Sequence, residues 1–126
     1  MILKLIISVG LGSIIGLERK KSNKAVGMRT ISLITLGSTI FTIVSSYYLQ
    51  ADPSRVIAQI VTGVGFIGGG IIFKNDMKIS GLTTASTVWC AAAVGVLVGI
   101  GLYELAVVST LLILIINVIF EEFKRE

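Results

Sequence analysis

The chain has 126 residues, of which 54% are hydrophobic and 14% are charged, and its formal net charge is +4. A water-soluble domain of this size carries about 25% charged residues, so the composition excludes most soluble classes. The sequence instead predicts an all-α integral membrane protein. Its charges fall almost entirely into the gaps between five apolar runs, at residues 2–17, 30–49, 56–73, 82–100 and 102–120.

Each apolar run is close to the ~20 residues that an α-helix needs to cross a hydrocarbon core about 30 Å thick. Backbone polar groups in lipid must be satisfied within the segment, which favours helices. We therefore expect a single transmembrane domain over residues 1–126, built as a bundle of about five spanning helices. In an alternative interpretation the glycine-rich third run is re-entrant, and only four helices span the membrane.

The basic residues predict the orientation of the bundle. If the runs alternate in direction, Lys4 and Arg55 lie on one side, and nine basic residues lie on the other: Arg19, Lys20, Lys21, Lys24, Arg29, Lys74, Lys78, Lys124 and Arg125. Cytoplasmic loops carry the excess of lysine and arginine, so we expect the N-terminus outside and the C-terminus in the cytoplasm. No aromatic residues interleave with these charges, which favours anionic lipid headgroups over nucleic acid as their partner.

Capping and turn residues mark several helix boundaries. Asp52-Pro53-Ser54 supplies an N-cap acceptor followed by proline at the first helical position, where the missing N–H costs nothing. Ser80-Gly81 offers a cap and a turn residue before the fourth run, after a short loop at Asn75-Asp76. Gly99-Ile100-Gly101 is the only break between the last two runs, so we expect a tight reversal there.

Glycine pairs predict where helices approach closely. Three G-x-x-x-G pairs lie inside the runs: Gly12 with Gly16, Gly65 with Gly69, and Gly95 with Gly99. Such pairs allow helix backbones to touch in a bilayer, either within the chain or between subunits. Three pairs on so small a chain predict a homo-oligomer, with a dimer favoured. The run from Gly68 through Gly69 to Gly70 can also unwind the third helix locally, as in membrane helices that line a cavity.

The segment from Gly63 through Gly65 to Gly68 matches the G-x-G-x-x-G dinucleotide fingerprint, but the context rules out a dinucleotide site. No βαβ unit surrounds it, no acidic residue follows about 20 positions later, and a bound pyrophosphate would lie in lipid. We therefore predict no cofactor.

The residue inventory disfavours an enzyme. The chain has no histidine and a single cysteine, Cys90, which excludes an internal disulfide, a Cys/His metal site and a Cys–His nucleophile. Thr83 and Thr84 begin a Ser/Thr-rich stretch without an accompanying base, and we expect hydrogen bonds between helices from such residues. The carboxylates are scattered over both sides, so we predict no metal site and no catalytic residues.

Polar residues near the inner surface need partners. Glu18 ends the first run, where the helix macrodipole disfavours an anion, and we expect Arg29 at the start of the second run to pair with it. The alternative is a Glu18 side chain solvated at the level of the headgroups. For Asn117, near the inner end of the fifth run, we expect one hydrogen bond to another helix.

A polar face descends from the outer surface along the third helix. Asp52, Arg55 and Gln59 follow one another at i, i+3 and i+7, and Gly63 extends this face. The N-cap accounts for Asp52, and Arg55 can reach the interface with its long side chain. Gln59 lies a full turn deeper and calls for a partner. Arg55 and Gln59 are therefore the candidate functional residues of the outer side.

Several ordered motifs carry a family resemblance: Gly16-Leu17-Glu18-Arg19, Gly27-Met28-Arg29-Thr30, Asp52-Pro53-Ser54-Arg55 with Gln59, Gly63 to Gly70, and Gly81-Leu82-Thr83-Thr84-Ala85 with Trp89. From about residue 10 to residue 99 the sequence closely resembles the MgtC/SapB family of bacterial inner-membrane proteins. The resemblance implies a five-helix membrane domain with a cytoplasmic C-terminus. Together with the spacing, it marks as functional polar candidates Glu18, Arg19, Arg29, Asp52, Arg55, Gln59, Thr83 and Thr84.

The resemblance also implies a physiological setting. The family is associated with magnesium limitation, with survival of pathogenic members inside macrophages, and with inhibition of the F-type ATP synthase. Pathogenic members carry a soluble domain after the fifth helix, whereas this sequence ends at Glu126, so a virulence role is not part of our expectation.

Two functions from different classes follow. We favour a non-enzymatic regulator that binds another membrane complex through helix faces, by resemblance the ATP synthase, in magnesium homeostasis or stress adaptation. The alternative is an oligomeric transporter or channel for a small ion or solute, in which the Arg55/Gln59 face and Gly68 to Gly70 line the path. The scarcity of charge within the apolar runs argues against a cation conductor.

Overall fold

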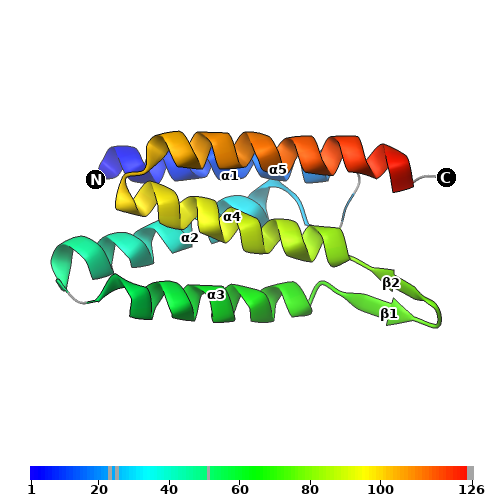
Figure 1. The fold of residues 1–126 in the computed structure, drawn as a ribbon, viewed down its shortest axis with the longest axis horizontal. Helices are drawn as coiled ribbons and strands as arrows, with labels where there is room; N and C mark the ends of the chain where they lie inside the picture. Colours follow the sequence, from blue (N-terminus) through cyan, green and yellow to red (C-terminus); the bar gives the residue numbers. More distant parts are fainter. Residues whose placement is uncertain (23, 25, 51, 125–126) are drawn as a thin grey trace.

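The computed structural model describes residues 1–22, 24, 26–50 and 52–124, with side chains up to Phe120. Over this part, five α-helices lie side by side along one axis (Figure 1). They are α1 (Ile2–Lys21), α2 (Met28–Ile43), α3 (Pro53–Gly69), α4 (Leu82–Ile100) and α5 (Tyr103–Lys124), with a π-helical turn, η1 (Val44–Tyr48), continuing α2. The predicted helical class is confirmed for the bulk of the chain.

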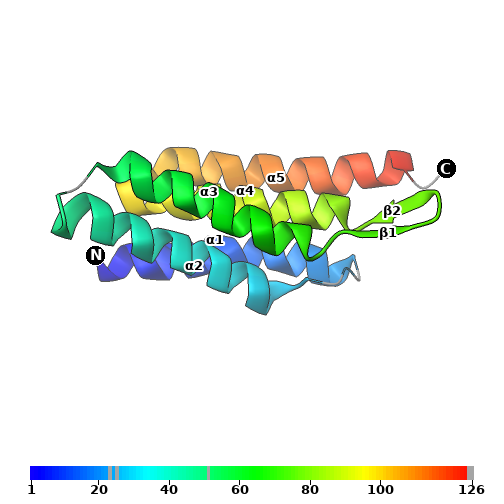
Figure 2. The same cartoon turned by 90° about the horizontal axis from the view of Figure 1, so that it is seen from below.

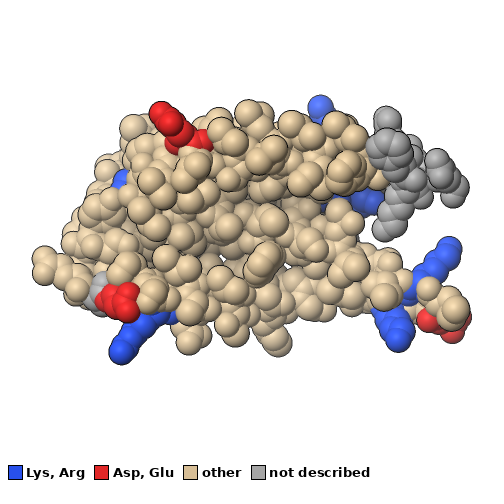
Figure 3. All heavy atoms as spheres, in the orientation of Figure 1, with Lys and Arg blue, Asp and Glu red and all other residues tan. Residues whose placement is uncertain are grey.

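Successive helices alternate in direction, so the two termini lie at opposite ends of the bundle, as Figures 1 and 2 show. We call these the N-terminal end and the hairpin end, after the β-hairpin beside the C-terminus. Lys4 and Arg55 belong to the N-terminal end, whereas the other basic residues of the described side chains belong to the hairpin end. On the face drawn in Figure 3, charged side chains lie toward the two ends and the middle carries none.

Within the described residues, three helical segments are long and apolar enough to cross a membrane: Met28–Tyr48, Leu82–Ile100 and Tyr103–Phe120. α1 is as long, with 20 residues, but has Lys4 near its start and charged residues in its last turn. α3 has 17 residues, about 25 Å at 1.5 Å per residue, somewhat short of a hydrocarbon core about 30 Å thick. The apolar helices identify a membrane protein.

Several predicted boundaries are confirmed. α4 spans the predicted 82–100. Asp52 caps α3, because its Oδ1 accepts a hydrogen bond from the Ser54 backbone N–H at 3.0 Å, and Pro53 occupies the first turn. The reversal before α5 is tight, with Gly101 at φ +99°, a left-handed conformation that glycine adopts without steric cost.

The third apolar run was predicted wrongly at its end. α3 stops at Gly69, and the chain then forms two antiparallel strands, β1 (Phe73–Asn75) and β2 (Lys78–Ser80), where we expected helix followed by a short loop. The apolar residues before β1 continue the hydrophobic run, so composition alone does not mark the helix end. Asp76, with φ +55°, supports the two-residue turn, since aspartate tolerates this conformation.

Gly81 fixes the base of the hairpin. Its φ is +84°, and a Cβ at this position would collide with the backbone carbonyl of Ile71. The chain therefore leaves α3 and enters α4 by way of a close backbone contact that only glycine permits.

The other helix ends differ by a few residues. α1 runs to Lys21 and α5 to Lys124, beyond the predicted 17 and 120, and α2 begins at Met28. Charged residues such as lysine and glutamate are good helix formers, so helices continue past the apolar part that a hydropathy pattern reveals.

α4 is the central helix and contacts each of the other four. α4 packs most closely against α2, which presents small hydroxyl side chains to glycines of α4. Thr39 Oγ1 lies 2.8 Å from the Gly95 carbonyl and 3.0 Å from the Thr35 carbonyl, so its single proton can serve either acceptor. A Cβ on Gly95 would collide with the Thr35 carbonyl, and one on Gly99 would lie 2.7 Å from Thr42 Cβ.

Two of the three glycine pairs thus pack within the chain, both against α2. On α1, a Cβ at Gly12 would lie 2.8 Å from Thr35 Oγ1, and one at Gly16 would lie 2.5 Å from the Cα of Met28. The third pair, Gly65 and Gly69 on α3, has nothing within 4 Å of either added Cβ. α2 packs between two helices that present glycines to it, whereas the Gly65 and Gly69 pair of α3 is uncovered.

At the N-terminal end, the buried Lys4 of α1 contacts both η1 and α4. It is 8% exposed, and its Nζ donates to the Tyr47 hydroxyl at 2.8 Å and to the Gly99 carbonyl at 3.0 Å. The ammonium also lies 4.1 Å from the centre of the Tyr47 ring, a cation–π contact. Because the carbonyl end of a helix favours a cation, Lys4 satisfies the C-terminus of α4 and joins it to α1 and η1.

The close α2–α4 contact predicts that replacing an α4 glycine by alanine destabilises the protein. We expect Gly95→Ala, and likewise Gly99→Ala, to lower the free energy of unfolding by about 1–3 kcal/mol, the usual cost of overpacking. Thermal unfolding in detergent, followed by circular dichroism, measures this. Gly37→Ala in α2 is the matched control, because an added Cβ there meets nothing within 4 Å. Equal midpoints for Gly95→Ala and the control would contradict the observed packing.

Candidate functional site

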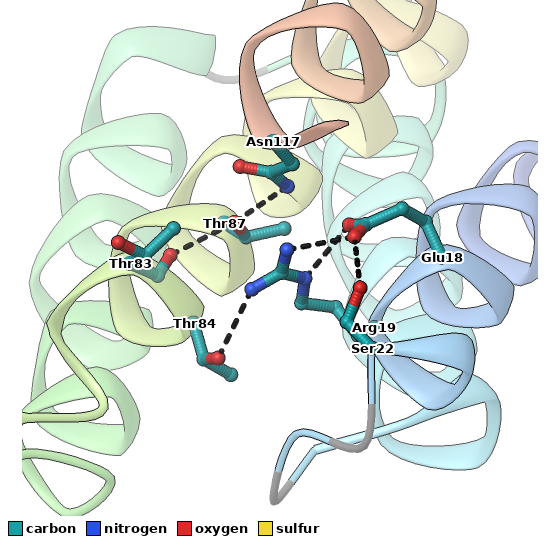
Figure 4. Close-up of polar contacts among 7 residues, drawn as sticks. All are labelled: Glu18, Arg19, Ser22, Thr83, Thr84, Thr87 and Asn117. Atoms are coloured by element: carbon teal, nitrogen blue, oxygen red, sulfur yellow. Dashed lines mark hydrogen bonds and ion pairs between the residues drawn. The ribbon is translucent and has the colours of Figure 1, made fainter. Parts of the chain in front are cut away.

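A buried polar cluster occupies the hairpin end of the bundle, where α1, α4 and α5 meet (Figure 4). Its centre is Arg19, whose residue exposure is 1%. Arg19 Nε and Nη2 each lie 2.8 Å from an oxygen of the Glu18 carboxylate, which makes a two-point ion pair. Two opposite charges paired in this way form a neutral unit, and this is how buried charges are retained in proteins.

Further hydrogen bonds fix both members of the ion pair. Ser22 Oγ donates to Glu18 Oε2 at 2.8 Å, from one turn further along α1. Arg19 Nη1 donates to Thr84 Oγ1 in α4 at 3.4 Å. The ion pair therefore ties the end of α1 to the first turn of α4.

Next to this ion pair, one hydrogen bond links α5 to α4, and a second within α4 continues from it. Asn117 Nδ2 donates to Thr87 Oγ1 at 3.0 Å, and Thr87 Oγ1 in turn donates to the Thr83 carbonyl at 2.8 Å. The single interhelical hydrogen bond predicted for Asn117 is confirmed. Thr84 also forms the expected interhelical bond, whereas Thr83 contributes its backbone and has an exposed side chain.

The predicted pairing of Glu18 with Arg29 is wrong. Glu18 pairs with its neighbour Arg19, and Arg29 is exposed and makes no ion pair with the described residues. The backbone of Met28 packs on Gly16 of α1, and this contact turns the next side chain, Arg29, away from the helix interface. The connection between the two runs brings the helix ends together but does not fix which side chains face each other.

The predicted outer residues lie on the surface of α3. Asp52, Arg55 and Gln59 are all exposed. Hydrogen bonds from the Ser54 side chain and backbone lower the pKa of Asp52, as expected for an N-cap carboxylate. Neither Arg55 nor Gln59 has a hydrogen bond or ion pair to the rest of the described chain, so the partner we expected for Gln59 does not come from within the described chain.

α3 also presents a face of small residues that the sequence analysis recognised only in part. Ala58, Thr62, Gly65 and Gly69 follow at i, i+4, i+7 and i+11, so they lie along one side of the helix, and all are exposed. We call these four residues the small-residue face. α3 buries only Ile60 and Gly68 and leaves this side uncovered.

Sequence reasoning missed two features: the burial of Arg19 and Lys4, and the contact of the α2 hydroxyl residues with α4. A hydropathy pattern assigns charged residues to loops or helix ends, so it could not predict that the Arg19 and Lys4 side chains are buried. The hydroxyl residues of α2 that contact α4 do carry a signal, because Thr35, Thr39 and Thr42 repeat at helical spacing. Hydroxyls at such spacing inside an apolar run are typical of a helix interface in a membrane.

A polar cluster buried at one end of an apolar helical bundle, and an uncovered small-residue face on α3, are features of a helical membrane protein. The sequence matches the MgtC family over residues 5–126, so the chain belongs to this family. It is 40% identical over 96% of its length to protein MgtC of Salmonella typhimurium and 47% identical over 85% to protein MgtC of Brucella abortus.

A third relative is an uncharacterized protein of Synechocystis, 42% identical over 93% of the chain. The matched regions cover 52%, 45% and 50% of the Salmonella, Brucella and Synechocystis proteins, so the chain spans about half the length of these curated relatives. No solved structure matches the chain.

The ion pair predicts non-additive effects on stability. We expect Glu18→Gln and Arg19→Gln each to destabilise the protein by about 3 kcal/mol, because each leaves one buried charge unpaired. The double variant should cost less than the sum by more than about 1 kcal/mol. Unfolding free energies in mixed micelles measure the cycle. The same cycle with Arg29→Gln in place of Arg19→Gln serves as the control and should be additive; coupling to Arg29 but not Arg19 would contradict the geometry.

Proposed function

We propose that the chain is a non-enzymatic regulator in the bacterial inner membrane, which acts by docking the small-residue face of α3 against a helix of another membrane protein. The observation that carries this proposal is the uncovered Gly65 and Gly69 pair. Helix pairs in a bilayer associate where small residues let backbones approach closely, and this face presents four such positions in succession.

The rest of the bundle supports this assignment by contrast. The other two glycine pairs are fully engaged within the chain, where an added Cβ would meet α2. α3 packs chiefly on α4, with few contacts to α2. Phe66, next to Gly65, is 85% exposed, and aromatic side chains are enriched in the buried centres of protein interfaces.

The physiological setting comes from the family resemblance. It points to magnesium homeostasis or stress adaptation and to the F-type ATP synthase as the docked complex. A second copy of the chain is another partner that fits the same face, with a dimer favoured. The anionic headgroups of the cytoplasmic leaflet complement the basic hairpin end, which agrees with an N-terminus outside and five spans.

A transporter or channel is the alternative, but the geometry gives it less support. The grooves that flank α3 are lined mainly by apolar side chains, and in the groove beside α2 the charged and amide groups, Arg55 and Gln59, lie toward one end. A conducted ion needs polar groups or water along its path. Purified protein in vesicles that conducted Mg²⁺ or anions would favour this alternative.

The docking hypothesis is tested by bulky residues on α3. We expect the double variant Gly65→Leu with Gly69→Leu to fold normally, since both positions are open, yet to lose growth support in low magnesium and co-purification with its membrane partner. Gly10→Leu in α1 is the matched control, because Gly10 is equally open and lies on another helix.

The outcome separates docking from packing. Loss of growth support with unchanged thermal stability supports the docking face, and light scattering in detergent shows whether a dimer is lost at the same time. Full growth support by the double variant would refute the proposal. An equal loss of growth support in the Gly10→Leu control would show that a larger side chain on any open helix surface has this effect.

The proposed orientation predicts accessibility from each side. In a Cys90→Ser background, Tyr48→Cys at the N-terminal end should react with a membrane-impermeant maleimide added to intact spheroplasts. Met77→Cys at the hairpin tip should react only after permeabilisation. Both native side chains are well exposed, at 69% and 98%, so burial does not limit labelling. Reaction of both from the same side would contradict the alternating five-span arrangement.

A further inference from the structure

An apolar groove of about 720 Å³ separates α2 from α3. Side chains such as Leu33 and Phe41 of α2 and Ile60 and Ile67 of α3 form its walls. Gly37 and Gly63 lie on opposite walls, and neither has an atom within 4 Å of an added Cβ. The groove exists because these two helices are splayed apart, while α4 holds both of them from the other side.

The groove carries polar groups toward one end. Among the described residues that line it, Arg55 is the one that carries a charge, and Gln59 lies one turn deeper. The nearest carboxylate along the helix is Asp52, whose Oδ1 accepts hydrogen bonds from both the backbone N–H and the hydroxyl of Ser54. Arg55 therefore offers its guanidinium, and Gln59 its amide, to a ligand in the groove.

The dimensions match one leaflet of a bilayer. On α3 the lining runs from Arg55 to Ile67, which is about 18 Å at 1.5 Å per residue. Half of a hydrocarbon core about 30 Å thick is about 15 Å. An acyl chain lying along the apolar walls would thus reach mid-bilayer while its headgroup stayed level with Arg55.

The positive charge of Arg55 favours a lipid with an anionic headgroup. A guanidinium binds phosphate oxygens through two parallel N–H donors, and a net negative headgroup complements a lone cation better than a zwitterion, which brings its own ammonium. The Gln59 amide N–H₂ is placed to donate to an ester carbonyl, which lies below the phosphate in a phospholipid. An apolar groove left empty would forfeit packing contacts along both walls.

We propose that the α2–α3 groove binds one anionic phospholipid, with its headgroup at Arg55 and Gln59 and an acyl chain along the walls. This site lies at the N-terminal end, opposite the basic hairpin end. The lipid site lies on the side of α3 that faces α2, whereas the small-residue face lies on another side. The lipid proposal can therefore be tested independently of the proposed docking.

The test compares lipid retention by purified, delipidated protein in detergent, using native mass spectrometry. Phosphatidylglycerol and phosphatidylcholine with identical acyl chains are offered in equal amounts. We expect one phosphatidylglycerol per chain to be retained over phosphatidylcholine by about tenfold, as a charge-assisted hydrogen-bonded contact provides. Arg55→Ala should abolish this preference, and Gln59→Ala should weaken retention of both lipids.

Two matched pairs of variants locate the site. Gly63→Leu fills the groove and should reduce retention of both lipids, whereas Gly65→Leu, two residues along the same helix but outside the groove, should retain them as the native chain does. Arg29→Ala removes an exposed arginine at the opposite end and should leave the preference intact. Circular dichroism confirms that each variant keeps its helical content.

Several results would overturn the proposal. The first is equal retention of the two lipids by the native chain, and the second is a preference that survives Arg55→Ala. A preference lost in Arg29→Ala would place the anion site at the hairpin end. If inorganic phosphate alone displaced the bound lipid, the acyl chain would not be held by the groove. A change in oligomer mass with Gly63→Leu, without lipid loss, would identify a second helix as the occupant.

Discussion

The close contact between α2 and α4 is the constraint on which the rest of the bundle depends. In lipid there is no hydrophobic force that drives helices together, so packing and interhelical hydrogen bonds must hold them. Here Gly95 and Gly99 bring the α4 backbone against the hydroxyl residues of α2, and Thr39 can donate to the α4 carbonyl at Gly95. α1 reinforces the contact from the other side, because Gly12 packs against Thr35.

This contact has a consequence for α3. Since α2 packs between α1 and α4, α3 packs chiefly along α4 and makes few contacts with α2, so one side of α3 faces the surroundings. The same helix carries Arg55 and Gln59, which have no partner among the described residues, and the open glycines Gly65 and Gly69. α3 thus combines open small residues with polar side chains that have no partner in the described chain, and this combination gives it the capacity to bind something else.

The buried charges at the two ends of the bundle are compensated in different ways. At the hairpin end Arg19 is neutralised by the adjacent Glu18, so a buried pair enters the bundle without net charge. At the N-terminal end Lys4 pairs with no carboxylate of the described residues and instead donates to the Gly99 carbonyl of α4 and the Tyr47 hydroxyl of η1. Both arrangements join helices that are distant in sequence, which gives these charges a structural role.

The sequence by itself determined the membrane class, the approximate helices, the cap at Asp52 and the distribution of basic residues, because lipid and helix ends impose requirements that are local in the chain. It also identified α3 as the helix with unusual polar and small residues. Only the tertiary structure decided the partner of Glu18, the glycine pairs used internally and the groove beside Gln59. These depend on how each helix is rotated about its axis, and that rotation is fixed by contacts between helices that no single apolar run encodes.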